Sequence, residues 1–228
     1  MFPNKINTCQ LTGIIFLLNI IKNKVMKIEQ LNLITEYSKG VLNKESIIKI
    51  NGEDYYELLE FYLNDLNSST IRQDITCNVL GLKISNSKLG YDSDDSNDEI
   101  KPKNISTKKL KKTNLTCGGG YSDLTHKRHK KFIEDNVMIH CSGFIDGQLM
   151  FIIGVPYSDL ENHFKIKLDN YLPNGDVINT YVRSATFSFT QIKTCPNTKI
   201  EFIRGDIDNF KLFIGKELYK FLKKNENV

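Results

Sequence analysis

Two stretches near the N-terminus, 27–39 and 53–66, carry apolar residues at helical spacing. The second stretch has acids on its opposite face, which is the pattern of an amphipathic helix with one buried side. Further on, 71–84 alternates apolar and polar positions and predicts a strand with a bulge. We therefore predict a mostly helical N-terminal part over 26–84. The apolar face of the second stretch comprises Tyr55, Leu58, Leu59, Tyr62, Leu63 and Leu66.

Hydrophobic periodicity then disappears over 85–120, a segment rich in Ser, Asn, Asp and Lys. The segment begins as an acidic low-complexity stretch and becomes basic. A connection of this length without regular structure is unusual inside a compact domain. We predict a flexible charged linker here, which separates the N-terminal part from a second domain over 121–228.

The pattern resumes with two β-rich runs, Val137–Phe144 and Gln148–Val155, joined by Asp146-Gly147. Asp-Gly between two such runs predicts a hairpin, because a type I′ turn needs positive φ at both central residues. A helix over 123–135, with Ser122 as its N-cap, precedes the hairpin.

The rest of the chain predicts two more strands between two helices. Ser158 and Glu161 form a capping box that opens the first helix. Asn174-Gly175 supplies a turn before the strands. The predicted elements are a helix over 158–171, strands over 177–191 and 198–204, and a helix over 208–223.

Together these elements predict an α+β fold. The N-terminal helical segment and the charged linker lead into an α-ββ-α-ββ-α domain. We expect that domain to have an antiparallel sheet covered by helices on one face. Whether its two ββα units are a duplication is left open, because no residue-level match links them.

An apolar run over 11–21 stands apart from this organisation. It is too short to span a bilayer, which takes about 20 residues, and it lacks the flanks of a secretory signal. Three interpretations remain open. The run is a buried helix or strand, a weak membrane anchor, or part of a 25-residue segment that is not translated because synthesis starts at Met26.

Composition excludes wholesale disorder, since 40% of the 228 residues are hydrophobic and 25% are charged. Lys, Ile and Asn make up 77 residues, a bias typical of A/T-rich genomes. The five cysteines are odd in number and form no CxxC pair. We therefore expect free thiols in a reducing compartment, and an intracellular protein of cytoplasm or nucleus rather than a secreted one.

The net charge of +4 is unevenly placed. Residues 88–100 sum to −4, whereas 101–131 hold ten Lys or Arg against a single Asp and sum to +9. This basic segment makes a non-enzymatic binding protein the leading hypothesis, with nucleic acid or an acidic protein as partner. A membrane partner is not expected, and oligomeric state is left open. The candidate contact residues are Lys108, Lys109, Lys111, Lys112, Lys127, Arg128, Lys130 and Lys131.

Two serines in the acidic stretch, Ser93 and Ser96, fit the pattern of acidic-directed phosphorylation. A phosphate on either would strengthen attraction to the lysines that follow. The alternative is a solvated loop whose opposite charges keep it soluble.

The three glycines in Cys117-Gly118-Gly119-Gly120 precede a predicted helix. They match neither a Walker A loop nor the G-x-G-x-x-G fingerprint. An anion-binding loop and a flexible hinge are both compatible with them, and the hinge is the favoured interpretation.

Cys117, His126 and His129 are candidate zinc ligands, with His140 and Cys141 nearby in the sequence. Their spacing fits no common zinc finger. Because His140 and Cys141 are adjacent on a predicted strand, they point to opposite faces and cannot both join the helix histidines. No cofactor is strongly implied.

A helix followed by a hairpin with an acid at its turn resembles the opening of the PD-(D/E)xK restriction-endonuclease core. In that family an Asp precedes an E-x-K triplet on the next strand, and the carboxylates hold Mg²⁺. Asp146 stands where that Asp is expected, but the triplet position reads Ile153-Gly154-Val155. Asp123 and Glu134 are the only acids we identify as substitutes, so the resemblance implies an inactive copy.

Three functional hypotheses follow from the sequence. The first is the binding protein that uses the basic segment. The second is a metal-dependent nuclease-like enzyme, active or degenerate, centred on Asp146 and Asp123. The third is a structural or protein–protein interaction component in which the lysines only solubilise the chain.

Overall fold

The computed structural model describes residues 28–64, 69–85, 91–106 and 117–225. The apolar run over 11–21 lies outside these residues, and so do Lys108, Lys109, Lys111 and Lys112. The α+β class predicted from the sequence is confirmed: within the described residues, four helices precede the first strand, and helices alternate with strands after it.

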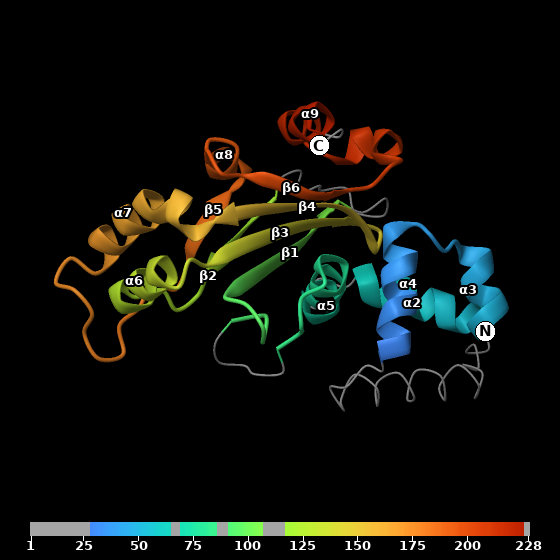
Figure 1. The fold of residues 1–228 in the computed structure, drawn as a ribbon, viewed down its shortest axis with the longest axis horizontal. Coiled ribbons are helices and arrows are strands. Elements are labelled where there is room, and N and C mark those ends of the chain that lie inside the picture. The colour runs from blue at the N-terminus through green and yellow to red at the C-terminus, as the bar shows by residue number, and fades with distance from the viewer. Residues whose placement is uncertain (1–27, 65–68, 86–90, 107–116, 226–228) are drawn as a thin grey trace, which may run out of the picture.

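A four-stranded sheet in the order β1-β3-β4-β6 forms the centre of the fold (Figure 1). The sheet is mixed, because β1 runs parallel to β3 while β3–β4 and β4–β6 are antiparallel. A second, two-stranded antiparallel sheet pairs β2 with β5. The strands are β1 Asp98–Ser106, β2 Gly118–Tyr121, β3 Met138–Ile145, β4 Gln148–Pro156, β5 Ala185–Ser188 and β6 Lys199–Ile203.

The β3–β4 hairpin has the predicted turn. Asp146 and Gly147 both have positive φ, 48° and 74°, as a two-residue type I′ connection requires. Nearly every residue of the two strands is buried, since the sheet is covered on both faces.

The N-terminal helices pack on one face of this sheet. They are α2 Ile28–Lys39, α3 Lys44–Asn51, α4 Glu53–Asn64 and α5 Ser69–Leu80. Their apolar side chains share a core with Phe144, Leu149 and Ile152 of the hairpin. Polar contacts join the same surfaces, for Thr76 and Ser142 share a hydrogen bond of 2.7 Å between their hydroxyl groups.

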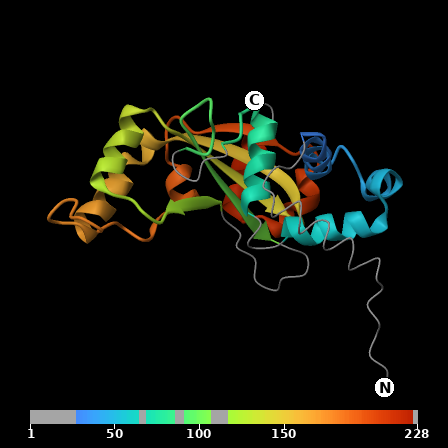
Figure 2. The ribbon, with the colours of Figure 1, turned by 90° about the horizontal axis from the view of Figure 1, so that it is seen from below.

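The other face is covered by the later helices and by the small β2–β5 sheet (Figures 1 and 2). Their bounds are α6 His126–Glu134, η1 Tyr157–Leu160, α7 Glu161–Tyr171, α8 Phe189–Ile192, η2 Ile207–Phe213 and α9 Lys216–Lys224. The expected antiparallel pairing holds for β3–β4 and β4–β6, but β1 adds a parallel edge and the N-terminal helices cover the second face. Edge strand β1, which supplies the parallel pairing, comes from the segment predicted to be a linker.

That segment was predicted to lack regular structure, and for 98–106 the prediction is wrong. Ile100 and Ile105 of β1 are buried, and β1 pairs with β3 over its whole length. The strand shows no apolar alternation, because Ile100 and Ile105 are five positions apart and most other positions are charged or polar. These charges are stable inside the fold because they contact one another, as described below.

The strand predicted over 71–84 is also wrong, because this region forms helix α5. Its buried residues Ile71, Arg72, Ile75 and Thr76 follow helical i, i+4 spacing. The alternation of Ile75, Cys77 and Val79 resembled a strand. Packing of α5 against α2 and β1 decides between the two patterns.

Three C-terminal boundaries differ from the predictions. Helix α6 begins after Thr125, whose hydroxyl accepts from the Arg128 backbone N–H, and Ser122 is not its cap. No side-chain cap opens η1 or α7, so the predicted capping box is absent. Only 185–188 of the strand predicted over 177–191 is a strand, and the last predicted helix is interrupted at Ile214-Gly215.

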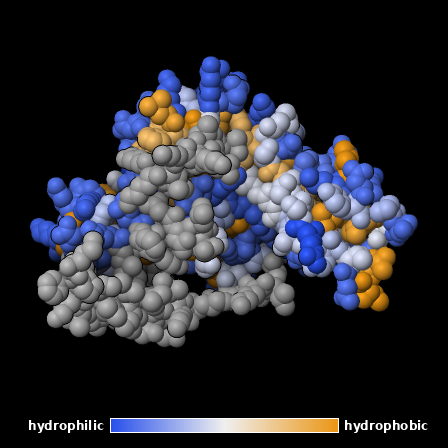
Figure 3. All heavy atoms as spheres, turned by 180° about the vertical axis from the view of Figure 1, so that it is seen from behind, coloured by the Kyte–Doolittle hydropathy of each residue, from blue (hydrophilic) through white to orange (hydrophobic). Residues whose placement is uncertain are grey.

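Over the coloured part of the surface seen from behind, hydrophilic side chains are interspersed with hydrophobic ones (Figure 3). Some of the hydrophobic ones lie at the right-hand end of that view, which carries α6, α7 and the connection from α7 to β5. Among the described residues, no helix combines the length and apolar character needed to cross a membrane.

Candidate functional site

An open cavity of about 940 Å³ lies between β1, the end of β2 and helix α6. Charged side chains line it throughout, five basic and five acidic. Both signs occur at the rim, where Asp123 and Glu134 are exposed beside the lysines, and both occur at the base. Lys127, Lys130 and Lys131 on the α6 rim are exposed, whereas Glu99 at the base is only 5% exposed.

Three residues at the base come from the segment that precedes and begins β1. Glu99 and Lys101 are two positions apart on the strand, so their side chains lie on the same face. Asp92 is held beside them because its carboxylate accepts from the Ile100 backbone N–H at 2.7 Å and its own N–H donates to the Asp98 carbonyl at 3.0 Å. The strand and the turn before it thus bring two carboxylates and one ammonium together.

The Lys101 ammonium lies between these carboxylates. Its Nζ donates to Glu99 Oε2 at 2.5 Å and lies 3.8 Å from Asp92 Oδ2. Burial raises the pKa of Glu99, and the positive charge of Lys101 opposes that rise. A buried carboxylate with a perturbed pKa and a charge partner, in an open cavity, is a frequent mark of a functional site.

Arg128 of α6 connects the base of the cavity to its rim. One terminal nitrogen lies 3.6 Å from Glu99 Oε1, and the other forms an ion pair with Asp123. Its guanidinium also lies 4.9 Å from the centre of the Phe132 ring. These contacts fix the guanidinium with its charge directed at the cavity base.

The remaining cations of α6 form a looser, solvent-facing row. Lys130 and Lys131 each lie within 4 Å of an acid one turn further on, Glu134 and Asp135. Exposed pairs of this kind contribute little to stability. The row is therefore able to exchange these intrahelical contacts for an anionic ligand.

The structure places only some of the predicted contact residues. Lys127, Arg128, Lys130 and Lys131 all line the cavity. The four lysines over 108–112 lie outside the described residues. Of the two proposed catalytic acids, Asp123 lines the cavity, whereas Asp146 sits in the turn at the far end of β3. The fold does not bring Asp123 and Asp146 together.

The glycine triplet is neither a loop nor a hinge, since Gly118–Gly120 form β2 and pair with β5. Gly119 is required by packing, because a Cβ there would lie 2.8 Å from the Lys101 side chain. The absence of a side chain at Gly119 leaves room for Lys101 to reach the base of the cavity.

The candidate zinc ligands do not converge. Cys117 is buried in the core, His126 Nδ1 lies 2.9 Å from Asp176, and His129 Nδ1 shares a hydrogen bond of 2.9 Å with the Tyr157 hydroxyl. Within the described residues, no group of three or more His, Cys, Asp or Glu side chains is arranged to hold a metal ion.

The two serines proposed for phosphorylation are built into the turn before β1. Ser93 is buried, and its hydroxyl lies 2.6 Å from Asp95 Oδ1, to which it donates, and 3.1 Å from the Lys83 carbonyl oxygen. Ser96 is half-buried and its hydroxyl donates to Asp98. Modification of Ser93 would require this turn to open.

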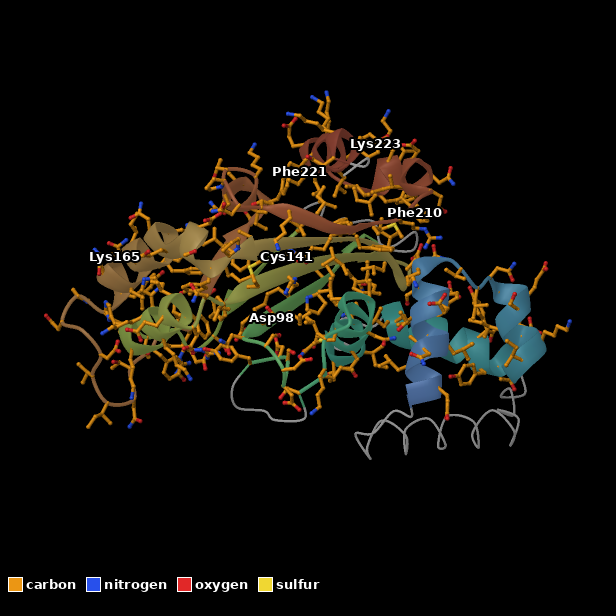
Figure 4. The ribbon with its side chains drawn as sticks, viewed as in Figure 1. Asp98, Cys141, Lys165, Phe210, Phe221 and Lys223 are labelled. Atoms are coloured by element: carbon orange, nitrogen blue, oxygen red, sulfur yellow. The ribbon has the colours of Figure 1, made fainter. Side chains whose placement is uncertain are left out.

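A second charged cluster lies on the opposite face of β1. His140 of β3 lies 3.3 Å from Asp98 Oδ1 and 2.6 Å from Glu201 Oε2. Figure 4 shows Asp98 on one side of the sheet, with Phe210 and Phe221 on the other. Glu201 reaches His140 because the intervening residue is Gly154, where a Cβ would lie 2.5 Å from its carboxylate.

The partners of His140 determine its charge. Burial by itself lowers the pKa of His140, but the two carboxylates outweigh burial and raise it to about 9. Burial likewise works to raise the pKa of Asp98, whereas His140 and Ser96 bring it below its usual value. His140 is therefore a buried cation that joins β1, β3 and β6.

Sequence reasoning missed Asp92, Glu99 and Lys101. Glu99-Ile100-Lys101 is an E-x-K triplet, the pattern we sought after Asp146 and did not find there. The signal was present in the sequence, but it lay in a segment interpreted as a linker. Recognising 98–106 as a strand would have revealed it.

No protein-family model matches the chain, and no curated protein matches it either.

Proposed function

We propose that this protein is a metal-dependent nuclease-like enzyme that cleaves phosphodiester bonds at the Asp92–Glu99–Lys101 cavity. The observation that supports it is the convergence of two carboxylates and a lysine at the base of an open cavity whose rim carries three exposed lysines. The proposal takes the second of the three hypotheses from the sequence and moves its centre from Asp146 to the start of β1.

The base offers two carboxylates to a divalent cation, which would take the place of the Lys101 ammonium between them. Mg²⁺ is commonly bound through one or two carboxylates, with water and substrate phosphate completing its shell. Asp92 and Glu99 would supply those carboxylates. Bound Mg²⁺ would polarise the phosphate and lower the pKa of a water molecule.

The other residues have roles that depend on their own charges. Lys101 is placed to stabilise negative charge that develops on a phosphate above Glu99, and Arg128 is placed to orient that phosphate. Lys127, Lys130 and Lys131 would bind the flanking phosphates of the same strand, which gives salt-sensitive affinity without sequence preference.

The experiment incubates the full chain with labelled single-stranded and duplex DNA and RNA, in Mg²⁺, in Mn²⁺ and in EDTA, followed by denaturing gels. We expect metal-dependent shortening that falls at least about 100-fold in Glu99→Gln. Glu134→Gln is the matched control, since Glu134 lines the same cavity but is exposed on α6. Equal cleavage by Glu99→Gln and the wild-type protein would refute the proposed site.

The second candidate is the non-enzymatic binding protein, which the exposed lysine row of α6 favours. It predicts intact strands under all metal conditions, with affinity that falls steeply between about 50 and 200 mM salt. Replacing Lys127, Lys130 and Lys131 by Gln would lower the salt slope by about 2 to 3. If the protein neither cleaves nor binds nucleic acid, the hypothesis of a structural component remains.

A further inference from the structure

The connection between α7 and β5 carries an exposed apolar tip, which we define as residues 177–181. The side chain of Ile178 is 89% exposed, that of Val177 is 57% exposed and that of Tyr181 is 43% exposed. Tyr171, at the end of α7, is 70% exposed. Figure 3 shows hydrophobic side chains among hydrophilic ones at this end of the molecule.

The tip is held by the segment that lines the cavity. On one side of the tip, Asp176 accepts from the backbone N–H groups of His126 and Lys127, both at 2.8 Å. On the other side, Val182 and Leu124 form a β-bridge. Because Asp123, Thr125 and Lys127 line the cavity, both ends of the tip are attached beside its mouth.

The tip itself is an ordered turn. Thr180 donates its hydroxyl to the Val177 carbonyl at 2.7 Å and accepts from the Val177 N–H at 3.0 Å. Asn179 has a φ of 64°, a left-handed conformation that turns the chain directly after Ile178. An exposed aliphatic side chain on a fixed turn suits insertion into a partner.

We propose that the tip contacts unpaired or unstacked bases of the nucleic acid whose backbone lies along α6. Tyr181, with the Arg183 guanidinium 5.9 Å from its ring centre, offers a flat surface for base stacking. Ile178 serves as the apolar wedge that keeps neighbouring bases apart. The inference rests on the proposed function and adds a preference for single-stranded or locally opened substrate.

A lipid surface fits the tip less well. Two aliphatic side chains and two tyrosines form a small apolar area, and stable membrane attachment takes a second strong signal. The continuity of the tip with the exposed lysines of α6 instead favours one polyanion that contacts both.

The test is a fluorescence-anisotropy titration of the full chain, in EDTA, with a labelled single-stranded DNA and with its duplex. We compare the wild-type protein with a tip variant, Ile178→Ser together with Tyr181→Ser. The matched control is Leu212→Ser, which removes an 88% exposed side chain from η2. In a parallel titration, vesicles of phosphatidylserine and phosphatidylcholine replace the DNA. Binding to the vesicles is measured by co-sedimentation.

We expect the tip variant to bind single-stranded DNA about tenfold more weakly, with an unchanged salt slope because no phosphate contact is removed. The control variant should bind like the wild-type protein. Wild-type affinity in the tip variant would overturn this inference alone. Failure of the wild-type protein to bind any nucleic acid would overturn the proposed function as well, and tip-dependent vesicle binding would assign the tip to lipid instead.

Discussion

Two charged clusters include neighbouring residues of β1 but lie in different surroundings. Glu99 faces the cavity with Asp92, Lys101 and Arg128, whereas Asp98 faces the other side of the sheet with His140 and Glu201. Alternation along the strand separates them. One cluster opens to a space of about 940 Å³, and the other is enclosed by protein.

The two clusters differ in whether their charged groups are accessible to a ligand. In the enclosed cluster one buried cation lies between two carboxylates, which leaves a net charge of −1. In the open cluster the same types of charge line a cavity, so their contacts can be exchanged for those of a substrate. Under the proposed function the Asp92 side of β1 carries the chemistry, whereas the Asp98 side joins strands of the sheet.

The largest expected effect is on the cavity side. Lys101→Met should lower metal-dependent cleavage about 100-fold or more, because the charge that stabilises the reacting phosphate is lost. Single-turnover cleavage assays measure this. Lys103→Met is the control, since Lys103 lies two residues further along β1 and does not line the cavity; equal losses in both variants would contradict a specific role for Lys101.

The next effect concerns the enclosed cluster. His140→Ala should lower the free energy of unfolding by about 3 kcal/mol, because it leaves two largely buried carboxylates without their cation. Urea unfolding followed by circular dichroism measures it. His163→Ala, which removes one hydrogen bond to the Thr186 carbonyl, should change stability much less; the folded fraction of both variants should cleave at the wild-type rate.

The third prediction uses pH to sharpen the same contrast. The folded-state pKa of His140, about 9, lies above its ordinary value near 6.5. The protonated histidine therefore stabilises the fold fully below about pH 6.5, and this stabilisation is lost as pH rises through about 9. The stability difference between wild type and His140→Ala should shrink by up to about 3 kcal/mol over that range; a constant difference in urea unfolding across these pH values would exclude the ion cluster as its source.

The smallest effect tests how the rim helix begins. Thr125→Ala should lower the free energy of unfolding by about 1 kcal/mol, since its hydroxyl caps α6 through the Arg128 N–H. Ser122→Ala should leave stability nearly unchanged, because Ser122 is exposed and caps nothing at this helix. Thermal unfolding of the two variants measures the difference. A larger loss in Ser122→Ala than in Thr125→Ala would support Ser122 as the cap, as predicted from the sequence.

Some of this protein was readable from local sequence alone. Apolar spacing predicted α2 and α4, and Asp146-Gly147 predicted the hairpin. The clustered positive charge identified the basic residues that lie on α6. Each signal acts between residues a few positions apart, so the chain need not be folded for it to be recognised.

Tertiary structure decided the rest. Whether 98–106 is a linker or a strand depends on β3, about 40 residues away, and only that pairing sets Glu99 and Lys101 on one face. The enclosed cluster joins residues 42 and 61 positions apart, across a glycine that no local pattern singles out. A strand rich in charged residues is not recognisable from the sequence. Such residues are stable inside a fold only with partners that the folded chain supplies.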